Sequence, residues 1–197
     1  MINKTEVESH LRFHFFSLSG GSRVKRVKRE LAYQGKKLTM YRDYMDINGK
    51  EVVWDFFHNR GGACVVPVLK DGRIVLVRQY REAVDQYCYE IPGGAYDSDT
   101  EDGRDCVQRE LEEETGYYSD DIEFLLGIHS LVAFCDEQVK IYVAKNLQET
   151  TQHLDEEEEI EVHIFSVEEI KEMIHTGKIT DAKTVAGLLG YMQKNNL

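Results

Sequence analysis

The stretch GAYDSDTEDGRDCVQRELEEETGY, residues 94–117, decides how this chain is interpreted. Its second half predicts a helix, on which residues three and four apart are neighbours. Glu110, Glu113 and Glu114 therefore lie in one narrow sector, whereas Glu112 points to nearly the opposite side and is expected in solvent. Like charges placed so closely repel each other, and hard divalent cations such as Mg²⁺ or Mn²⁺ prefer carboxylate oxygens. The pattern therefore predicts a metal site.

The same stretch resembles the Nudix box, whose pattern is G-x5-E-x7-R-E-U-x-E-E-x-G-U, with U a bulky apolar residue. The matching positions after the first glycine are Glu101, Arg109-Glu110, Leu111, Glu113-Glu114 and Gly116. Six residues rather than five separate Gly94 from Glu101, and Tyr117 stands where the pattern has an aliphatic residue. The extra residue falls in a loop, where insertions are tolerated best. The alternative is an acidic, solvated helix that matches by accident.

Three further segments resemble the ADP-ribose pyrophosphatase branch of that superfamily: Val75–Arg81, Glu90–Gly94 and Asp181–Thr184. The resemblance implies an α/β fold, a Nudix-type α/β/α sandwich with a mixed sheet, in residues 59–197. It also implies an N-terminal antiparallel strand region, residues 1–58, that mediates homodimerisation. The loop Ser130–Glu137 departs from the branch, because it lacks the proline and glycine of a Ser-Pro-Gly-like loop that contributes to substrate choice.

What the resemblance implies about activity is hydrolysis of a nucleoside diphosphate linked to another moiety. ADP-ribose, cleaved to AMP and ribose 5-phosphate, is the leading substrate, and Mg²⁺, with Mn²⁺ as a possible substitute, is the cofactor. Such ions neutralise the diphosphate and acidify a bound water. The expected metal ligands are the carbonyl of Gly93, Glu101, Glu110, Glu113, Glu114 and Glu158. Glu101 is expected to orient Arg109 or a metal-bound water rather than the substrate.

A general base is expected in the acidic run Asp155–Glu159, where this branch has a catalytic loop glutamate. Counting back from the predicted strand Ile160–Phe165 favours Glu156 as the base and Glu158 as an extra metal ligand. The alternative is a solvated, mobile loop, which such runs usually form. The expected catalytic group is Glu156, Glu158, Glu113 and Arg109, with Arg109 holding the carboxylates in place.

The expected substrate contacts are three. Arg81 follows the predicted strand Ile74–Tyr80, where the branch has a phosphate-binding arginine. Arg60 and Trp54 are candidates to clamp or stack an adenine. For Trp54, packing in a dimer interface is an open alternative.

Apolar periodicity and turn signals predict the other elements. The expected strands of the main domain are Ala63–Leu69, Ile74–Tyr80, Tyr87–Ile91, Glu123–His129, Val139–Ala144 and Ile160–Phe165. The expected helices run roughly from Glu101 to Thr115 with Gly116 as C-cap, from a capping box at Ser166–Glu169 to Gly177, and over Asp181–Lys194. Before residue 60, Asn48-Gly49 predicts a hairpin turn between Lys37–Met45 and Val52–Phe57.

Composition narrows the partners. A net charge of −12 argues against nucleic acid as a general partner. The alternating basic run Arg23–Arg29 is therefore interpreted as an exposed strand with one basic face. No apolar run is long enough for a membrane span or a signal peptide, so a cytoplasmic location without membrane contact is expected. The four cysteines show no C-x-x-C pair or zinc spacing and are expected to be buried free thiols.

Other functions stay open. Alternative substrates are GDP-mannose, UDP-glucose, NADH and dinucleoside polyphosphates. A non-catalytic, nucleotide-sugar-sensing Nudix protein is disfavoured, because every box carboxylate is present. An isomerase acting on isoprenoid diphosphates would need Cys135 and Glu137 to face an apolar pocket.

Overall fold

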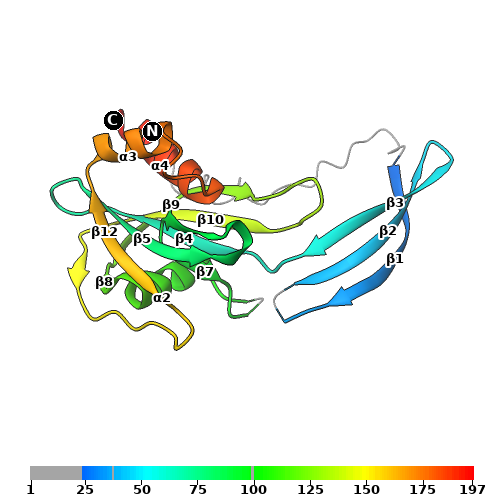
Figure 1. The fold of residues 1–197 in the computed structure, drawn as a ribbon, viewed down its shortest axis with the longest axis horizontal. Helices are drawn as coiled ribbons and strands as arrows, with labels where there is room; N and C mark the ends of the chain where they lie inside the picture. The colour runs from blue at the N-terminus through cyan, green and yellow to red at the C-terminus, as the bar shows by residue number, and fades with distance from the viewer. Residues whose placement is uncertain (1–23, 37, 99) are drawn as a thin grey trace. The chain divides into compact units, whose positions relative to one another are not determined.

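The computed structural model describes residues 24–36, 38–98 and 100–197 and divides the chain into two compact units (Figure 1). Of the described residues, the N-terminal unit contains 24–35 and 39–56. The C-terminal unit contains Lys36–Leu38 and Phe57–Leu197. Arg23 and Lys37, the first residues of two predicted segments, lie outside the described residues.

The N-terminal unit is a three-stranded sheet in the order β1-β2-β3, formed by Val24–Gln34, Thr39–Ile47 and Lys50–His58. Between β2 and β3, Asn48 and Gly49 have φ angles of 55° and 80°. Positive φ at both central residues is what a two-residue hairpin of type I′ requires, so the predicted turn is confirmed. Strand β1 is almost entirely exposed, as its alternation of basic and apolar residues predicts.

The C-terminal unit is built on two main sheets. The first has the order β7-β4-β10-β9, formed by Gly93–Ala95, Gly62–Pro67, Gln138–Lys145 and Asp121–His129. It is mixed, because β4 and β10 are parallel whereas their other neighbours are antiparallel. The second is antiparallel with the order β12-β5-β6, formed by Ile160–Phe165, Ile74–Arg81 and Gln86–Glu90. Two short strands, β8 (Tyr117–Tyr118) and β11 (Gln148–Glu149), pair separately.

Among the described residues, three α-helices cover these sheets: α2 (Gly103–Thr115), α3 (Val167–His175) and α4 (Ala182–Asn195). A single 3-10 turn, η1 (Glu82–Val84), joins β5 to β6. Helix α3 begins with the predicted capping box at Ser166. Helix α2 begins two residues later than predicted, because Asp102 rather than Glu101 caps it by accepting a hydrogen bond from the amide of Arg104.

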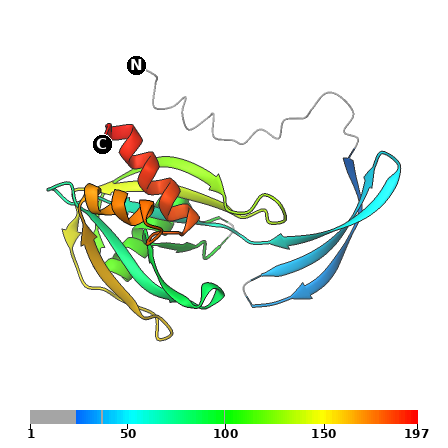
Figure 2. The ribbon, with the colours of Figure 1, turned by 45° about the horizontal axis from the view of Figure 1, so that its top comes forward.

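The two-residue period of β4 and β10 sorts their side chains into two cores. Cys64, Val66, Ile141 and Val143 pack with Leu188 and Tyr191 of α4, while Ala63, Val65, Tyr142 and Ala144 pack with Val107 and Leu111 of α2. Figures 1 and 2 show α2 on one side of these strands and α3 and α4 on the other. A strand buried on both faces in this way defines an α/β/α sandwich, so the predicted fold class is confirmed.

Two smaller expectations can be compared with the structure. Cys64, Cys88 and Cys106 are buried free thiols as predicted, whereas Cys135 is only partly buried. Within the described residues, the helices are too short or too polar for any of them to traverse a bilayer.

Candidate active site

Helix α2 places its carboxylates at the edge of the core. Its apolar residues Val107 and Leu111 are fully buried against the sheet. One turn away, Glu114 is 5% exposed and the side chain of Glu110 is 13% exposed, while the side chain of Glu113 is 42% exposed. The helix thus carries two buried carboxylates and one accessible carboxylate along the same side.

Strand β7 brings backbone against these carboxylates. The amide of Gly93 donates a hydrogen bond to Oε2 of Glu114 at 2.9 Å. A Cβ atom on Gly94 would lie 2.2 Å from Oε1 of Glu110, so a larger residue there would displace this carboxylate. The first glycine of the box thus lets the carboxylate of Glu110 lie directly against the backbone.

Arg109 contacts several carboxylates at once. Its Nη1 donates to Glu110 at 2.7 Å and to Glu113 at 3.2 Å, and its Nη2 donates to Glu101 at 3.4 Å. Glu101 also accepts a hydrogen bond of 2.6 Å from the amide of Asp97. These are the contacts that the predicted bracing role of Arg109 needs. Glu101 is joined to the loop and to Arg109, and it does not line the cavity described below.

Burial disfavours the ionised forms of Glu110 and Glu114. Burial, together with the negative charges of Glu110 and Glu158, raises the pKa of Glu114 to about 8, against the hydrogen bond from Gly93. Burial also raises the pKa of Glu110, although Arg109 opposes the shift. A bound cation would favour the ionised forms of both groups.

The donor set fits a hard divalent cation, because it consists of carboxylate oxygens. Across residues 24–36, 38–98 and 100–197, no three His, Cys, Asp or Glu side chains are gathered as a ready-made ligand cluster. Instead, Glu110 pairs with Arg109 and Glu114 pairs with the amide of Gly93.

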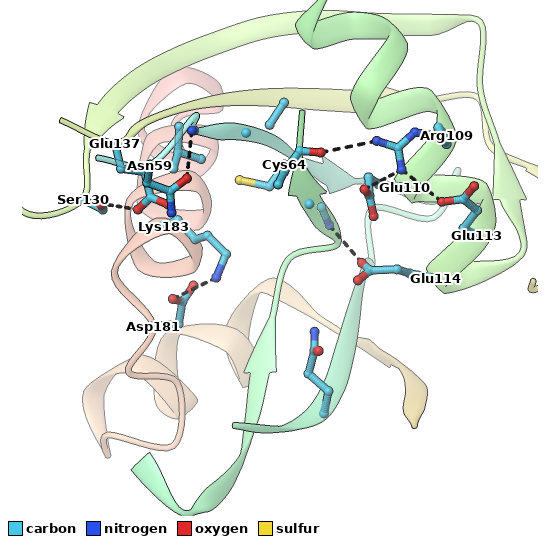
Figure 3. A pocket seen from close by; sticks show the side chains of 18 of the residues that line it. Asn59, Cys64, Arg109, Glu110, Glu113, Glu114, Ser130, Glu137, Asp181 and Lys183 are labelled. Atoms are coloured by element: carbon cyan, nitrogen blue, oxygen red, sulfur yellow. Dashed lines mark hydrogen bonds and ion pairs between the residues drawn. The ribbon is translucent and has the colours of Figure 1, made fainter. Parts of the chain in front are cut away.

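A cavity of about 660 Å³ opens beside these carboxylates. Arg109, Glu110, Glu113 and Glu114 line one side of it. Asp181 and Lys183 lie on the opposite side, as Figure 3 shows. Gln79 and Arg81 of β5 and the loop residues His153, Asp155 and Glu158 complete much of the wall. A wall of carboxylates thus faces a wall that carries cations.

Glu90, which does not line the cavity, pairs with two cations that do, Arg81 and Lys183. Arg81 donates from Nε and Nη2 to Glu90 at 2.6 and 2.7 Å, and Nζ of Lys183 donates to Glu90 at 2.6 Å. Nζ of Lys183 also pairs with Asp181 at 2.9 Å. Burial alone would raise the pKa of Glu90, but Arg81 and Lys183 outweigh it and the pKa is lowered. Sequence reasoning missed Glu90, Asp181 and Lys183 as site residues, although it singled out both of their segments.

The acidic loop is fastened to the box helix. The amide of His153 donates to the carbonyl of Glu113 at 2.9 Å, and the side chain of Gln152 donates to the carbonyl of Glu114 at 2.7 Å. The loop therefore brings His153, Asp155 and Glu158 to the cavity, whereas Glu156 is exposed and does not line it. No pattern near Gln152 or His153 signals this attachment.

The remaining predicted contacts differ in placement. Arg81 lines the cavity. Arg60 does not, and its Nη1 donates to the carbonyls of Tyr96 and Asp97 at 3.2 and 3.0 Å. Trp54 belongs to β3 of the N-terminal unit and is 48% exposed.

The loop that departs from the family pattern borders the cavity through Ser130 and Glu137, which are hydrogen-bonded to each other. Asp136 fastens the loop by accepting from the amide of Asn59 at 3.1 Å and by pairing with His58 at 2.8 Å. Cys135 does not line the cavity, and the cavity that Glu137 borders is lined largely by charged and polar residues. This arrangement lacks the apolar pocket that the isomerase alternative needs.

Comparisons with known proteins agree with this geometry. Residues 58–188 match the NUDIX domain, and the chain belongs to the Nudix family. It is 32% identical over 164 residues to the methanol dehydrogenase activator of Bacillus methanolicus, a match that covers 82% of this chain and 88% of that protein. It is 30% identical over 172 residues to the ADP-ribose pyrophosphatase of Bacillus subtilis (strain 168), covering 86% of this chain and 92% of that protein.

The fold agrees as well. A crystal structure of an ADP compounds hydrolase superposes with a TM-score of 0.79 at 19% identity, covering 88% of this chain and 94% of that one. Within its family, the chain is a pyrophosphohydrolase of the ADP-ribose pyrophosphatase-like branch, as the box and its neighbouring segments predict.

Proposed function

We propose that this protein hydrolyses ADP-ribose to AMP and ribose 5-phosphate with Mg²⁺ as its cofactor and Mn²⁺ as a possible substitute. The observation that carries the proposal is one cavity lined both by Glu110, Glu113 and Glu114 and by Arg81 and Lys183. A diphosphate bridged to two larger groups needs metal-binding oxygens and cationic donors together. The similarity to an ADP-ribose pyrophosphatase supports the choice of substrate.

The metal would be held by Glu110, Glu113 and Glu114, with the Gly93 carbonyl as a further ligand. Mg²⁺, when bound, neutralises phosphate charge and acidifies a water. Glu101 acts through Arg109, because it contacts that guanidinium and stays away from the cavity.

The chain's own groups then orient the diphosphate and move a proton. Arg81 and Lys183 bind phosphate oxygens on the wall away from the carboxylates. We assign the base to Glu158 rather than to Glu156, because a base must reach the attacking water and only Glu158 of the two lines the cavity. Arg60 and Trp54 remain our candidates for adenine contacts, for which R60A and W54A should raise KM more than they lower kcat.

The test is hydrolysis of a panel with Mg²⁺: ADP-ribose, GDP-mannose, UDP-glucose, NADH and diadenosine polyphosphates. We expect AMP release to be strongest from ADP-ribose and to stop with chelator. A preference for another compound of the panel would refute ADP-ribose as the substrate but leave the proposed reaction intact. Loop Leu131–Glu137 would then be the first place to look for the cause of substrate choice. Binding of nucleotide sugars without turnover of any would support the sensing alternative.

We also propose that residues 1–58 mediate a homodimer. Large apolar side chains of this region remain about half exposed or more in the single chain, namely Val27, Leu31, Val53 and Trp54. Exposed apolar side chains gathered on one small sheet are typical of a surface that a partner covers. Light scattering should report twice the chain mass at micromolar concentration, and a monomer there would refute the proposal.

A further inference from the structure

Glu90 is a buried carboxylate that holds two cations of the cavity without lining the cavity itself. Its side chain is 3% exposed, and both of its oxygens are used: Oε1 accepts from Nε of Arg81, and Oε2 accepts from Nη2 of Arg81 and from Nζ of Lys183. Arg81 and Lys183 are 102 residues apart, so this single carboxylate joins β5 to the start of α4.

The carboxylate is itself held in place from both sides. The hydroxyl of Thr184 accepts a hydrogen bond of 3.0 Å from the amide of Ile91, the residue after Glu90. Asp181 caps α4 by accepting from the amide of Thr184 at 2.9 Å, and it pairs with Lys183 at 2.9 Å. These contacts join the end of β6 to the first turn of α4.

The pairing still leaves donors for a ligand. Glu90 engages Nε and Nη2 of Arg81, so Nη1 of Arg81 has no partner among the described residues. Lys183 has three N–H donors and uses two, on Glu90 and Asp181. Both side chains line the cavity and are partly exposed, at 42% and 23%.

We propose that Glu90 is a positioning residue for substrate, which fixes Arg81 and Lys183 as one rigid pair of phosphate donors. This inference rests on the proposed function, because it assigns that pair to the diphosphate of its substrate. Long cationic side chains lose rotamer freedom when they bind a ligand, and a side chain already ordered by Glu90 loses less. Without Glu90, binding of the diphosphate itself has to order the side chain of Arg81, and Lys183 keeps only its ion pair with Asp181.

A purely structural ion pair is the competing explanation, since removing one partner of a buried pair destabilises a fold. Glu161 supplies a control for the loss of a carboxylate from an arginine of β5, although its side chain is 53% exposed and that of Glu90 only 3%, so a thermal melt of E90Q measures the cost of the buried pair. Glu161 pairs with Arg78, on the same strand β5, at 2.9 Å, but neither residue lines the cavity. Glu90→Gln and Glu161→Gln thus each remove one carboxylate from an arginine of β5, one behind the cavity and one outside it.

The experiment measures ADP binding by calorimetry in EDTA, where only cations of the chain can hold the phosphates. We expect E90Q to weaken binding about tenfold or more and E161Q to change it by less than about twofold. Kinetics on the best substrate of the panel should show the same split, with KM raised more than kcat is lowered in E90Q. Unchanged ADP affinity in an E90Q protein that melts as the wild type does would overturn the proposal.

A double-mutant cycle separates positioning from folding. Lys183→Gln removes one of the cations, so E90Q should cost less ADP affinity in the K183Q background than in the wild type. Equal costs in both backgrounds would mean that Glu90 does not act through Lys183, and the proposal would fail. If E90Q does not fold, Glu90→Asp serves in its place, since its shorter carboxylate cannot hold both cations as Glu90 does.

The two proposals can fail separately. ADP affinity that depends on Glu90, in a protein that hydrolyses nothing in the panel, would refute the proposed function and support the positioning role. Hydrolysis of ADP-ribose with the same ADP affinity and KM in wild type and E90Q would do the reverse.

Discussion

The carboxylates of helix α2 and those of the loop Asp155–Glu159 carry the same charge but meet opposite surroundings. Glu110 and Glu114 are nearly buried, and each has a defined partner at 2.7 to 2.9 Å. All five loop acids are exposed, and only Asp155 and Glu158 reach the cavity. A carboxylate therefore contributes to this site through the neighbours that hold it. The number of acids in a segment does not show which of them reach the site.

The strongest test of this comparison is Glu114→Gln. We expect kcat to fall by about three orders of magnitude or more, because the most buried of the proposed metal ligands loses its charge. The fold should persist, since an amide buried there carries no desolvation penalty for charge. Steady-state kinetics with a thermal melt would check both points. Turnover near the wild-type rate would refute the proposal that Glu114 is a metal ligand.

The loop offers a matched pair for the next test. Glu158→Gln should lower kcat by about 10²-fold, as loss of a general base does, while Glu156→Gln should change it by less than about threefold. The two residues are alike in type and exposure and differ in reaching the cavity. The reverse ranking would restore the base predicted by counting along the sequence.

The burial of Glu114 should also make the free energy of unfolding depend on pH. The pKa of Glu114 rises from 4.5 to about 8 on folding, so between these values the folded state binds more protons than the unfolded state. The contribution of Glu114 to the free energy of unfolding is therefore fully present below pH 4.5 and is lost as the pH rises towards 8. In EDTA, the free energy of unfolding should fall by on the order of 2 kcal/mol between pH 5 and pH 7 because of this group.

Glu114→Gln and saturating Mg²⁺ are the controls for that measurement. Each should flatten the decline, the first by removing the titrating group and the second by favouring its ionised form. A decline of the same size in wild type and E114Q would show that the effect arises elsewhere.

The smallest expected effect comes from the backbone beside the helix. Gly94→Ala places a Cβ against Oε1 of Glu110, so this carboxylate must move. We expect kcat to fall about tenfold, with a higher Mg²⁺ requirement. Around Gly72 a Cβ meets no atom within 4 Å, but its φ is 86°, so Gly72→Ala should lower the thermal stability while the kcat of the folded enzyme stays unchanged. Equal activity of G94A and wild type would show that Glu110 tolerates displacement.

Much of the fold could be predicted, because local patterns reflect local geometry. The period of two assigns the strands, and the same period sorts β4 and β10 into the two cores. The period of 3.6 puts Glu110, Glu113 and Glu114 on one side of α2, and Asn48-Gly49 makes the turn that it predicts. The start of α2 was misplaced because Glu101 and Asp102 are both acidic and only the cap geometry distinguishes them.

The family, the order of elements and the carboxylates of the box helix can be predicted without coordinates, because they follow from residue types at short, regular spacings. Only the tertiary structure decided that Glu90 joins Arg81 to Lys183, and that Glu158 rather than Glu156 reaches the cavity. Glu90 and Lys183 are 93 residues apart, and loop 155–159 is placed by hydrogen bonds from Gln152 and His153. Contacts of this kind depend on how sheets and helices pack, for which short-range periodicity carries no information.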